Sequence, residues 1–327
     1  MMKQRRFGKT DRMVSEISLG TWQLGTKWGE PFNEQEAMKI LEASYESGIN
    51  LIDTADIYND GNSEIAIGKF LKQHKDHYFV VTKCGRGLNP HVAEGYTPEN
   101  MERFIDGSLK RLGVERLDMV LLHCPPTSVY HNDALFAGMS NMVQKGKIAH
   151  YGVSVEKISE GLRAMEYPIS AIEVVFNMFR LKPIEELLPQ AKARDIGILA
   201  RVPLASGLLT GRYSKDTVFG TGDHRSYNRN GEAFDKGETF SGVDYNLGLK
   251  AVDALKQLFG TENLIPYALR WILMHDAVSA VIPGASRAEQ VLSNVRATEI
   301  AALTKEQMEA VTAIYDQYIR ESVHQNW

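Results

Sequence analysis

The sequence predicts an α/β protein that folds as a closed (β/α)8 barrel, and three observations lead to this fold class. Eight short runs of β-forming residues follow one another, and most are continuously apolar, as in strands buried on both faces. Segments with helical spacing separate them, which favours parallel strands. No GxGxxG motif follows an early strand, which disfavours the alternative, an open doubly wound sheet. The runs begin near Ile17, Ile49, Tyr78, Leu117, Ile148, Ala171, Ile198 and Val278.

The first element is expected to stand outside the strand-helix repeat. Residues 5–18 hold short apolar pieces around the polar stretch 9–12, which predicts a β-hairpin that closes the floor of the barrel. A chain of 327 residues is a normal size for one such barrel, so we expect a single domain over residues 1–327.

Two helices have clear boundaries in the sequence. Asn33, with Glu36 three residues later, resembles a capping box that starts the first helix, and Gly48 should end it. The pair Thr97-Pro98 should open a later helix that Gly113 terminates. Both helices therefore lie between predicted strands.

One long segment lacks periodicity. Residues 212–244 are rich in Gly, Asp, Ser, Asn and Thr and follow the seventh predicted strand. A stretch of this length inside a compact domain is usually a functional loop, so we expect an active-site or lid loop; a plain surface insertion is the alternative. Extra helices should follow near the C-terminus.

Composition indicates an ordinary globular protein, with 43% hydrophobic residues, 24% charged residues and a net charge of -4. Such a charge does not favour a nucleic-acid partner, and no apolar stretch is long enough to span a membrane. The N-terminus lacks the apolar region of a signal peptide, so a cytoplasmic location is the expectation. Nothing in the sequence predicts an oligomer, and a monomer is the default.

Four polar side chains stand at or just beyond the ends of three successive apolar runs: Asp53 and Tyr58, Lys83, and His123. An ammonium near a phenol stabilises the phenolate and lowers its pKa. A carboxylate would hold the ammonium, and an imidazole could orient a substrate oxygen. The four residue types together predict proton transfer to a developing alkoxide.

Other candidate groups carry less chemistry. Cys84 and Cys124 each follow one of these four residues and should lie near the barrel mouth, as small side chains beside the site or in a redox role. Five other histidines stand in polar segments without an HxH or HExxH pattern, so we expect no catalytic metal. These are His74, His77, His91, His131 and His224.

Several stretches resemble hallmark segments of the aldo-keto reductase family, in the family's order along the chain. They are LGTW at 19–22, GINLIDTADIYNDGNSE at 48–64, SLKRLGVERLDMVLLH at 108–123, GKIAHYGVS at 146–154, PLASGLLTGRY at 203–213 and VIPGASRAEQVLSN at 281–294. The resemblance implies metal-free, NAD(P)H-dependent reduction of an aldehyde or ketone. It also implies that Tyr58 is the general acid, Lys83 its pKa modulator, Asp53 the partner of Lys83, and His123 the residue that orients the carbonyl.

The resemblance further implies a set of cofactor contacts at the C-terminal face of the barrel. The nicotinamide end would involve Gly20, Thr21, Trp22, Asp53, Ser154, Glu173 and Arg201. The pyrophosphate end would involve Pro203, Leu204, Ser206, Gly207 and Leu209, and the adenosine end Gly284, Ser286, Arg287, Gln290 and Asn294. Arg287 favours NADPH over NADH, because a cation at a helix N-terminus suits a 2′-phosphate. The substrate would meet Trp22, Tyr58 and His123, with Trp28 and the segment 212–244 around it.

Three positions depart from the family pattern. Val155 stands where the family often has Asn, Glu173 where it often has Gln, and Arg201 where an aromatic residue commonly stacks on the nicotinamide. A guanidinium beside an oxidised, positively charged ring is unfavourable, so we expect preference for the reduced cofactor.

Two other functions stay open at this level. A member of the family could serve as a cofactor-binding regulatory subunit, associated with an ion channel, with little turnover. Alternatively, Lys83 could act as the nucleophile of a Schiff-base lyase, which requires an uncharged amine.

Overall fold

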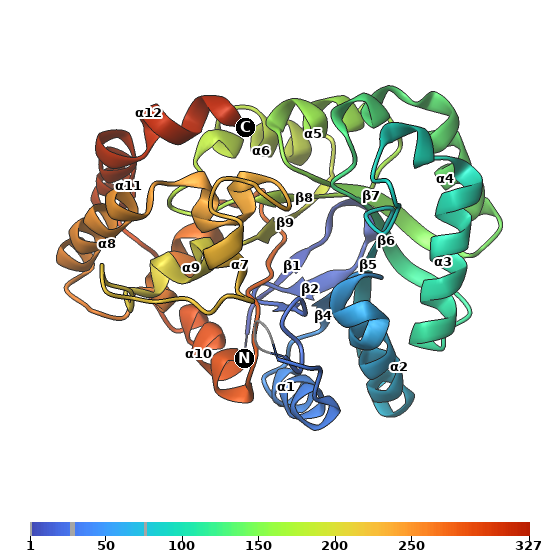
Figure 1. The fold of residues 1–327 in the computed structure, drawn as a ribbon, viewed down its shortest axis with the longest axis horizontal. Coiled ribbons are helices and arrows are strands. Elements are labelled where there is room, and N and C mark those ends of the chain that lie inside the picture. The colour runs from blue at the N-terminus through green and yellow to red at the C-terminus, as the bar shows by residue number, and fades with distance from the viewer. Residues whose placement is uncertain (1, 27–29, 75–76) are drawn as a thin grey trace.

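The computed structural model describes residues 2–26, 30–74 and 77–327. Its centre is a sheet of eight parallel strands in which each strand pairs with the next along the chain (Figure 1). They are β3 (Leu19–Gly20), β4 (Leu51–Asp53), β5 (Phe79–Cys84), β6 (Leu117–His123), β7 (Ile148–Val155), β8 (Ala171–Val175), β9 (Gly197–Arg201) and β10 (Ala280–Val281).

The sheet closes into a barrel between its first and last strands. The N–H of Ser18 donates to the carbonyl of Val281 at 2.9 Å, and parallel bridges join Ile17 to Val281 and Gly20 to Gly284. The predicted (β/α)8 barrel is thus confirmed, and a strand is found at each of the eight expected places.

Helices surround the barrel, and further helices extend it on one side (Figure 1). The surrounding helices are α1 (Glu34–Glu46), α2 (Asn62–His74), α3 (Pro98–Leu112), α4 (Asp133–Gln144), α5 (Ile158–Ala164), α6 (Leu187–Ala193), α9 (Ile265–Leu273) and α10 (Ala288–Val295). The additional ones are α7 (His224–Tyr227), α8 (Tyr245–Phe259), α11 (Lys305–Tyr318) and α12 (Arg320–Val323). No helix in the described ranges combines the length and apolarity needed to cross a bilayer.

Local chemistry explains where the two helices with predicted boundaries begin and end. The side chain of Asn33 accepts hydrogen bonds from the second and third backbone N–H groups of α1. The side chain of Thr97 accepts one hydrogen bond, from the backbone N–H of the third residue of α3, and Pro98 is the first residue of this helix. Gly113 ends α3 at φ 67°, a left-handed conformation that favours glycine. The predicted starts of both helices and the predicted end of α3 are confirmed, while α1 ends at Glu46, two residues before Gly48.

The barrel floor is closed by the predicted hairpin, formed by the antiparallel strands β1 (Gln4–Arg6) and β2 (Met13–Ser15). Phe7, within this hairpin, is fully buried and meets the ring of Phe79 edge-on, with ring centroids 5.7 Å apart. Phe7 also lies directly against Gly197, at the start of β9. The hairpin therefore seals the apolar interior at the end opposite to the strands' C-termini.

The close contact between Gly197 and Phe7 leads to a prediction about stability. An alanine Cβ at Gly197 would stand 2.3 Å from a ring carbon of Phe7, with backbone of the hairpin behind it. We expect Gly197→Ala to lower the free energy of unfolding by about 2 kcal/mol or more, measured by urea denaturation. Gly220→Ala is the control, because no atom of the described residues lies within 4 Å of that Cβ. Equal urea midpoints for the two variants would contradict a tightly packed floor.

The segment 212–244 contains three short helical turns joined by irregular chain. It contains α7 and 3-10 turns at Lys236–Glu238 and Phe240–Gly242. Ser206 Oγ donates to the carbonyl of Glu238 at 2.9 Å, and the indole of Trp327 donates to Asp235 at 2.9 Å. Tertiary contacts thus hold the segment in place, without any repeat in its own sequence.

Candidate active site

The four polar residues at the strand ends come together at the mouth of the barrel. Lys83 Nζ donates to Asp53 Oδ1 at 2.6 Å and to the carbonyl of Thr54 at 2.9 Å. It also lies 3.4 Å from the hydroxyl oxygen of Tyr58. The ring of His123 meets that of Tyr58 edge-on, with centroids 5.9 Å apart. These groups converge because β4, β5 and β6 are neighbours that end at the same edge.

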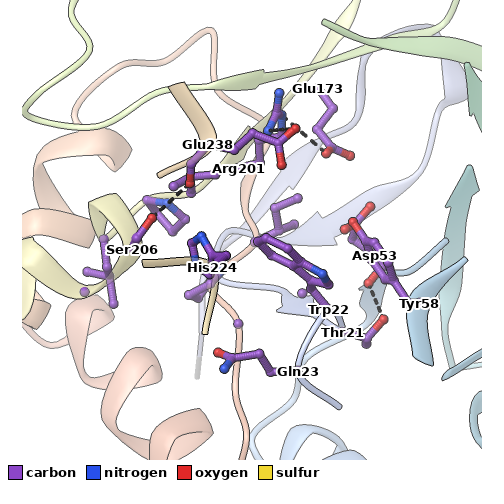
Figure 2. Close-up of a pocket in the computed structure, with 18 of the residues that line it drawn as sticks. Thr21, Trp22, Gln23, Asp53, Tyr58, Glu173, Arg201, Ser206, His224 and Glu238 are labelled. Carbon is purple, nitrogen blue, oxygen red and sulfur yellow. Dashed lines mark hydrogen bonds and ion pairs between the residues drawn. The ribbon is translucent and has the colours of Figure 1, made fainter. Parts of the chain in front are cut away.

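A cavity of about 440 Å³ opens above these residues. Figure 2 shows Trp22 in its wall, between His224 on one side and Tyr58 on the other. The ring centroids of Trp22 and His224 are 5.2 Å apart, and those of Trp22 and Tyr58 are 6.5 Å apart. The expected cofactor residues that line the cavity are Gly20, Thr21, Trp22, Asp53, Ser154, Glu173, Arg201, Pro203, Leu204, Ser206, Gly207, Gly284 and Gln290.

Four expected cofactor residues do not line this cavity. The side chain of Leu209 is fully buried in the outer core, so a cofactor contact at this residue would involve its backbone, and that contact stays a prediction. Ser286 donates to Gln290 at 2.7 Å through its backbone, and Asn294 donates to the carbonyl of Gly284 at 3.5 Å. Arg287 is exposed at the N-terminus of α10. These last three residues support or border the cavity rim, while Trp28 lies outside the described residues.

Glu173 and Arg201 form a charged network beside the quartet. Ser154 Oγ donates to Glu173 at 3.3 Å, and the other Glu173 oxygen lies 3.4 Å from Lys83 Nζ. Arg201 contacts Glu156 at 3.0 Å, Glu238 at 3.7 Å and Glu173 at 3.9 Å. Three carboxylates thus surround this guanidinium. The electrostatic reason for expecting it to disfavour an oxidised nicotinamide is therefore removed, although the preference itself stays a prediction.

Val155 and Cys84 face away from the cavity. Val155 is fully buried in the outer core, so the replacement of a polar residue there changes packing and not the cavity wall. Cys84 lies against Met101 of α3, with its sulfur atom 3.7 Å from the methionine sulfur. The expectation that Cys84 lies beside the site is wrong, because side chains alternate along β5 and Lys83 takes the inner face. Cys124 does lie at the site, 3.4 Å from the hydroxyl of Ser154.

Comparison with known proteins decides the family. The model of the Aldo/keto reductase family matches residues 16–316, nearly the whole chain. The chain belongs to the aldo/keto reductase family.

An NADH-specific methylglyoxal reductase of Escherichia coli is 31% identical over 345 residues, covering 95% of this chain and 99% of that protein. A putative voltage-gated potassium channel subunit beta of Schizosaccharomyces pombe is 28% identical over 324 residues, covering 95% and 92%. Among solved structures, a glycerol dehydrogenase of Gluconobacter oxydans is 28% identical with a TM-score of 0.78, covering 97% and 96%.

Burial controls the protonation of the acid and the imidazole in this aldo/keto reductase. Burial raises the pKa of Tyr58 above its ordinary value, while the ammonium of Lys83 acts in the opposite direction. Lys83 thus lowers the pKa of Tyr58 as the sequence predicts, but burial outweighs this effect and the net pKa is raised. Burial also lowers the pKa of His123 well below its ordinary value, and the charge of Arg86 adds to the effect. Both groups are thus neutral at neutral pH.

The ammonium stays charged although it is fully buried. Burial by itself lowers the pKa of Lys83, but the carboxylates of Asp53 and Glu173 outweigh it, and the net shift is upward. Burial and the neighbouring Glu173 raise the pKa of Asp53 well above its ordinary value, against the pull of Lys83. Two carboxylates therefore compete for one ammonium.

The residues at the site that were not foreseen include Arg86, Glu156, His224 and Glu238. Arg86 donates to Glu238 at 3.0 Å and lines the cavity. Glu156 and Glu238 also form a group with Cys124 whose ligand atoms lie within 4.8 Å of one another. Because Arg86 and Arg201 contact these carboxylates, a cation there would meet two guanidiniums. Arg86 and Glu156 could have been found as polar residues just beyond strand ends, whereas His224 and Glu238 come from the segment 212–244.

Proposed function

We propose that this aldo/keto reductase is an NADPH-dependent oxidoreductase that reduces an aldehyde or ketone to an alcohol. The observation that supports this most is the convergence of a phenol, a charged buried amine and a neutral imidazole at one cavity. A phenol next to an ammonium is suited to give a proton to an oxygen that gains negative charge. None of the three groups needs a metal ion for this task.

The residues that line the cavity fit a nicotinamide dinucleotide. Ser154 carries a donor and Glu173 an acceptor, as the carbonyl and the amino group of a carboxamide require. Val202, Ala205, Ser206 and Gly207 have positive φ, and such turns form concave nests of N–H groups that suit a phosphate. Around Gly284 the described part of the chain leaves open space, with none of its atoms within 4 Å of an added Cβ. Donor, acceptor and phosphate turn thus follow one another along the cavity.

The chemistry divides between the cofactor and the protein. A reduced nicotinamide, when bound, would supply a hydride to the carbonyl carbon. Tyr58 gives the proton of its hydroxyl to the carbonyl oxygen, and the ammonium of Lys83 stabilises the phenolate that remains. Asp53 holds Lys83 in position, and the neutral ring of His123 donates a hydrogen bond to the substrate oxygen. The segment 212–244 acts as a lid, because Arg225, Phe234 and Glu238 extend from it into the cavity wall.

The proposed preference for NADPH over NADH rests on Arg287. We expect Arg287→Ala to raise the Kd for NADPH about tenfold or more and to leave the Kd for NADH within about twofold, since a charge-assisted contact to the 2′-phosphate is lost. Fluorescence titration measures both constants. Arg296→Ala is the matched control, because it removes an exposed cation from the other end of α10. An equal effect on both cofactors would contradict a role in recognising the 2′-phosphate.

A second candidate function is a cofactor-binding regulatory subunit, which the putative potassium channel subunit among the relatives favours. NADPH titration followed by a panel of aldehydes and ketones separates the two. Binding with saturable turnover supports the reductase, and tight binding without turnover across the panel supports the subunit. Trapping of a substrate on Lys83 by borohydride would support the lyase, which the 2.6 Å contact between Lys83 and Asp53 disfavours.

A further inference from the structure

Glu173 lies on the inner face of β8, where its carboxylate is buried beside the active site. It pairs with Ser154 of β7 and with Leu199 of β9 in the sheet, so its side chain shares the barrel interior with the active site. Only 2% of the residue is exposed. One oxygen accepts from Ser154 at 3.3 Å, and the other makes an ion pair with Lys83 at 3.4 Å but accepts no hydrogen bond from the described residues.

Near Glu173, two buried carboxylates share one ammonium, that of Lys83. Lys83 is closer to Glu173 than Arg201 is, at 3.4 Å against 3.9 Å, and Arg201 has a nearer partner in Glu156. Lys83 also holds Asp53 at 2.6 Å. One ammonium therefore serves two buried carboxylates. Titratable and charged groups from several elements surround Glu173 and Tyr58. They are Asp53 from β4, Lys83 from β5, His123 from β6, Arg201 from β9 and Glu238 from the segment 212–244.

We propose that Glu173 is a second counter-ion of Lys83 and a positioning residue that extends to higher pH the range in which Tyr58 serves as the proton donor. This inference rests on the proposed reductase function and goes beyond the contact of Glu173 with a carboxamide. A neutral glutamine would leave the Lys83 charge shared with Asp53 alone. With Glu173 present, less of that charge is available to stabilise a phenolate at Tyr58. The carboxylates of Asp53 and Glu173 both raise the pKa of Tyr58, in addition to burial.

The first test is the pH dependence of carbonyl reduction by Glu173→Gln. Because reduction requires the protonated phenol, kcat/KM should fall above the pKa of Tyr58. This fall is the upper limb of the pH profile. We expect its midpoint to lie about one pH unit or more lower in Glu173→Gln than in the unaltered protein, the size of effect that a nearby buried charge produces. Glu173→Asp keeps the charge and should keep the original limb. A limb that moves equally in both variants, or in neither, would overturn the inference.

Glu156→Gln is the matched control for this profile. Glu156 is also a buried carboxyl group and lies nearer to Arg201 than Glu173 does, at 3.0 Å, but no contact joins it to Lys83 in the described structure. Its replacement removes the same carboxyl group without changing the number of counter-ions at Lys83. We expect its upper limb to coincide with that of the unaltered protein. A shift as large as that of Glu173→Gln would show a general charge effect and contradict the specific role.

The second test needs no catalysis. In the unaltered protein Asp53 has a raised pKa, so the folded state keeps a proton that the unfolded chain loses, and stability falls as the pH rises through the folded-state pKa. Glu173→Gln removes part of the rise in the pKa of Asp53. In urea unfolding without cofactor, the free energy of unfolding of the variant should therefore increase, relative to that of the unaltered protein, as the pH rises from about 5 to about 8.

The two readouts separate failure of the inference from failure of the proposed function. If the protein reduces no carbonyl, the relative stability of Glu173→Gln still reports whether Glu173 and Asp53 share Lys83. If the protein is active and neither the limb nor the relative stability changes with Glu173→Gln, the reductase proposal stands and the second counter-ion is excluded.

Discussion

Tyr58→Phe is expected to lower kcat for carbonyl reduction about a thousandfold, because the proposed proton donor is lost while the proposed hydride source remains. The Kd for NADPH should stay within about twofold, since the hydroxyl of Tyr58 lies beside Lys83 and is not part of the phosphate turn. Steady-state kinetics and fluorescence titration measure the two quantities on the same preparation. A kcat within tenfold of the unaltered protein would remove Tyr58 from the proposed chemistry.

Tyr227→Phe provides the control for this result. Tyr227 lines the same cavity but is 43% exposed and comes from the segment 212–244. The control removes one hydroxyl from the cavity wall in the same way as Tyr58→Phe. We expect kcat to stay within about threefold, because proton donation at Tyr58 gives a factor that a hydroxyl elsewhere in the wall does not.

Lys83→Met is expected to have the largest effect on stability. It leaves Asp53 and Glu173 buried without their ammonium, and removing one partner of a buried ion pair costs about 3–5 kcal/mol. The loss should be greater at about pH 8 than at about pH 5, because at lower pH the carboxylates of the variant take up protons and their repulsion is relieved. Urea unfolding at the two pH values measures this difference.

A surface lysine gives the comparison for Lys83→Met. Lys69 pairs with Glu34 at 2.7 Å, but both side chains are about half exposed, so Lys69→Met should cost at most about 1 kcal/mol at either pH. Lys83→Met should also lose carbonyl reduction, because no charge remains to stabilise the phenolate. Equal stability of the two variants would mean that the buried cluster is not held by Lys83.

The positions of the central residues could be predicted from sequence because strand ends converge. Asp53, Lys83 and His123 end or break successive apolar runs, and parallel neighbours in a barrel must present such residues at one edge. The same alternation places Cys84 on the outer face, so its burial against α3 was also available from the pattern. The motif match located the backbone segment around Leu209 but not the direction of its side chain, which is buried in the outer core.

Other features of the site have no local signal. Glu238 and His224 reach the cavity through turns of the segment 212–244, whose position depends on contacts with Ser206 and Trp327 and not on any periodicity. The sharing of Lys83 between two carboxylates also needed coordinates, because the sequence shows that Glu173 departs from the family pattern but not which cation it meets. The net rise in the pKa of Tyr58 follows from burial, which residue types alone do not reveal.

The central claim is that hydride from the cofactor and a proton from Tyr58 reach the same carbonyl group. The most direct measurement uses NADPH that carries deuterium at the transferable position of its nicotinamide ring, with mass spectrometry of the product of an aldehyde. The account predicts an alcohol with one deuterium on the former carbonyl carbon from the unaltered protein, and almost none of this alcohol from Tyr58→Phe. An alcohol without deuterium, or deuterated alcohol formed equally fast by both proteins, would contradict it.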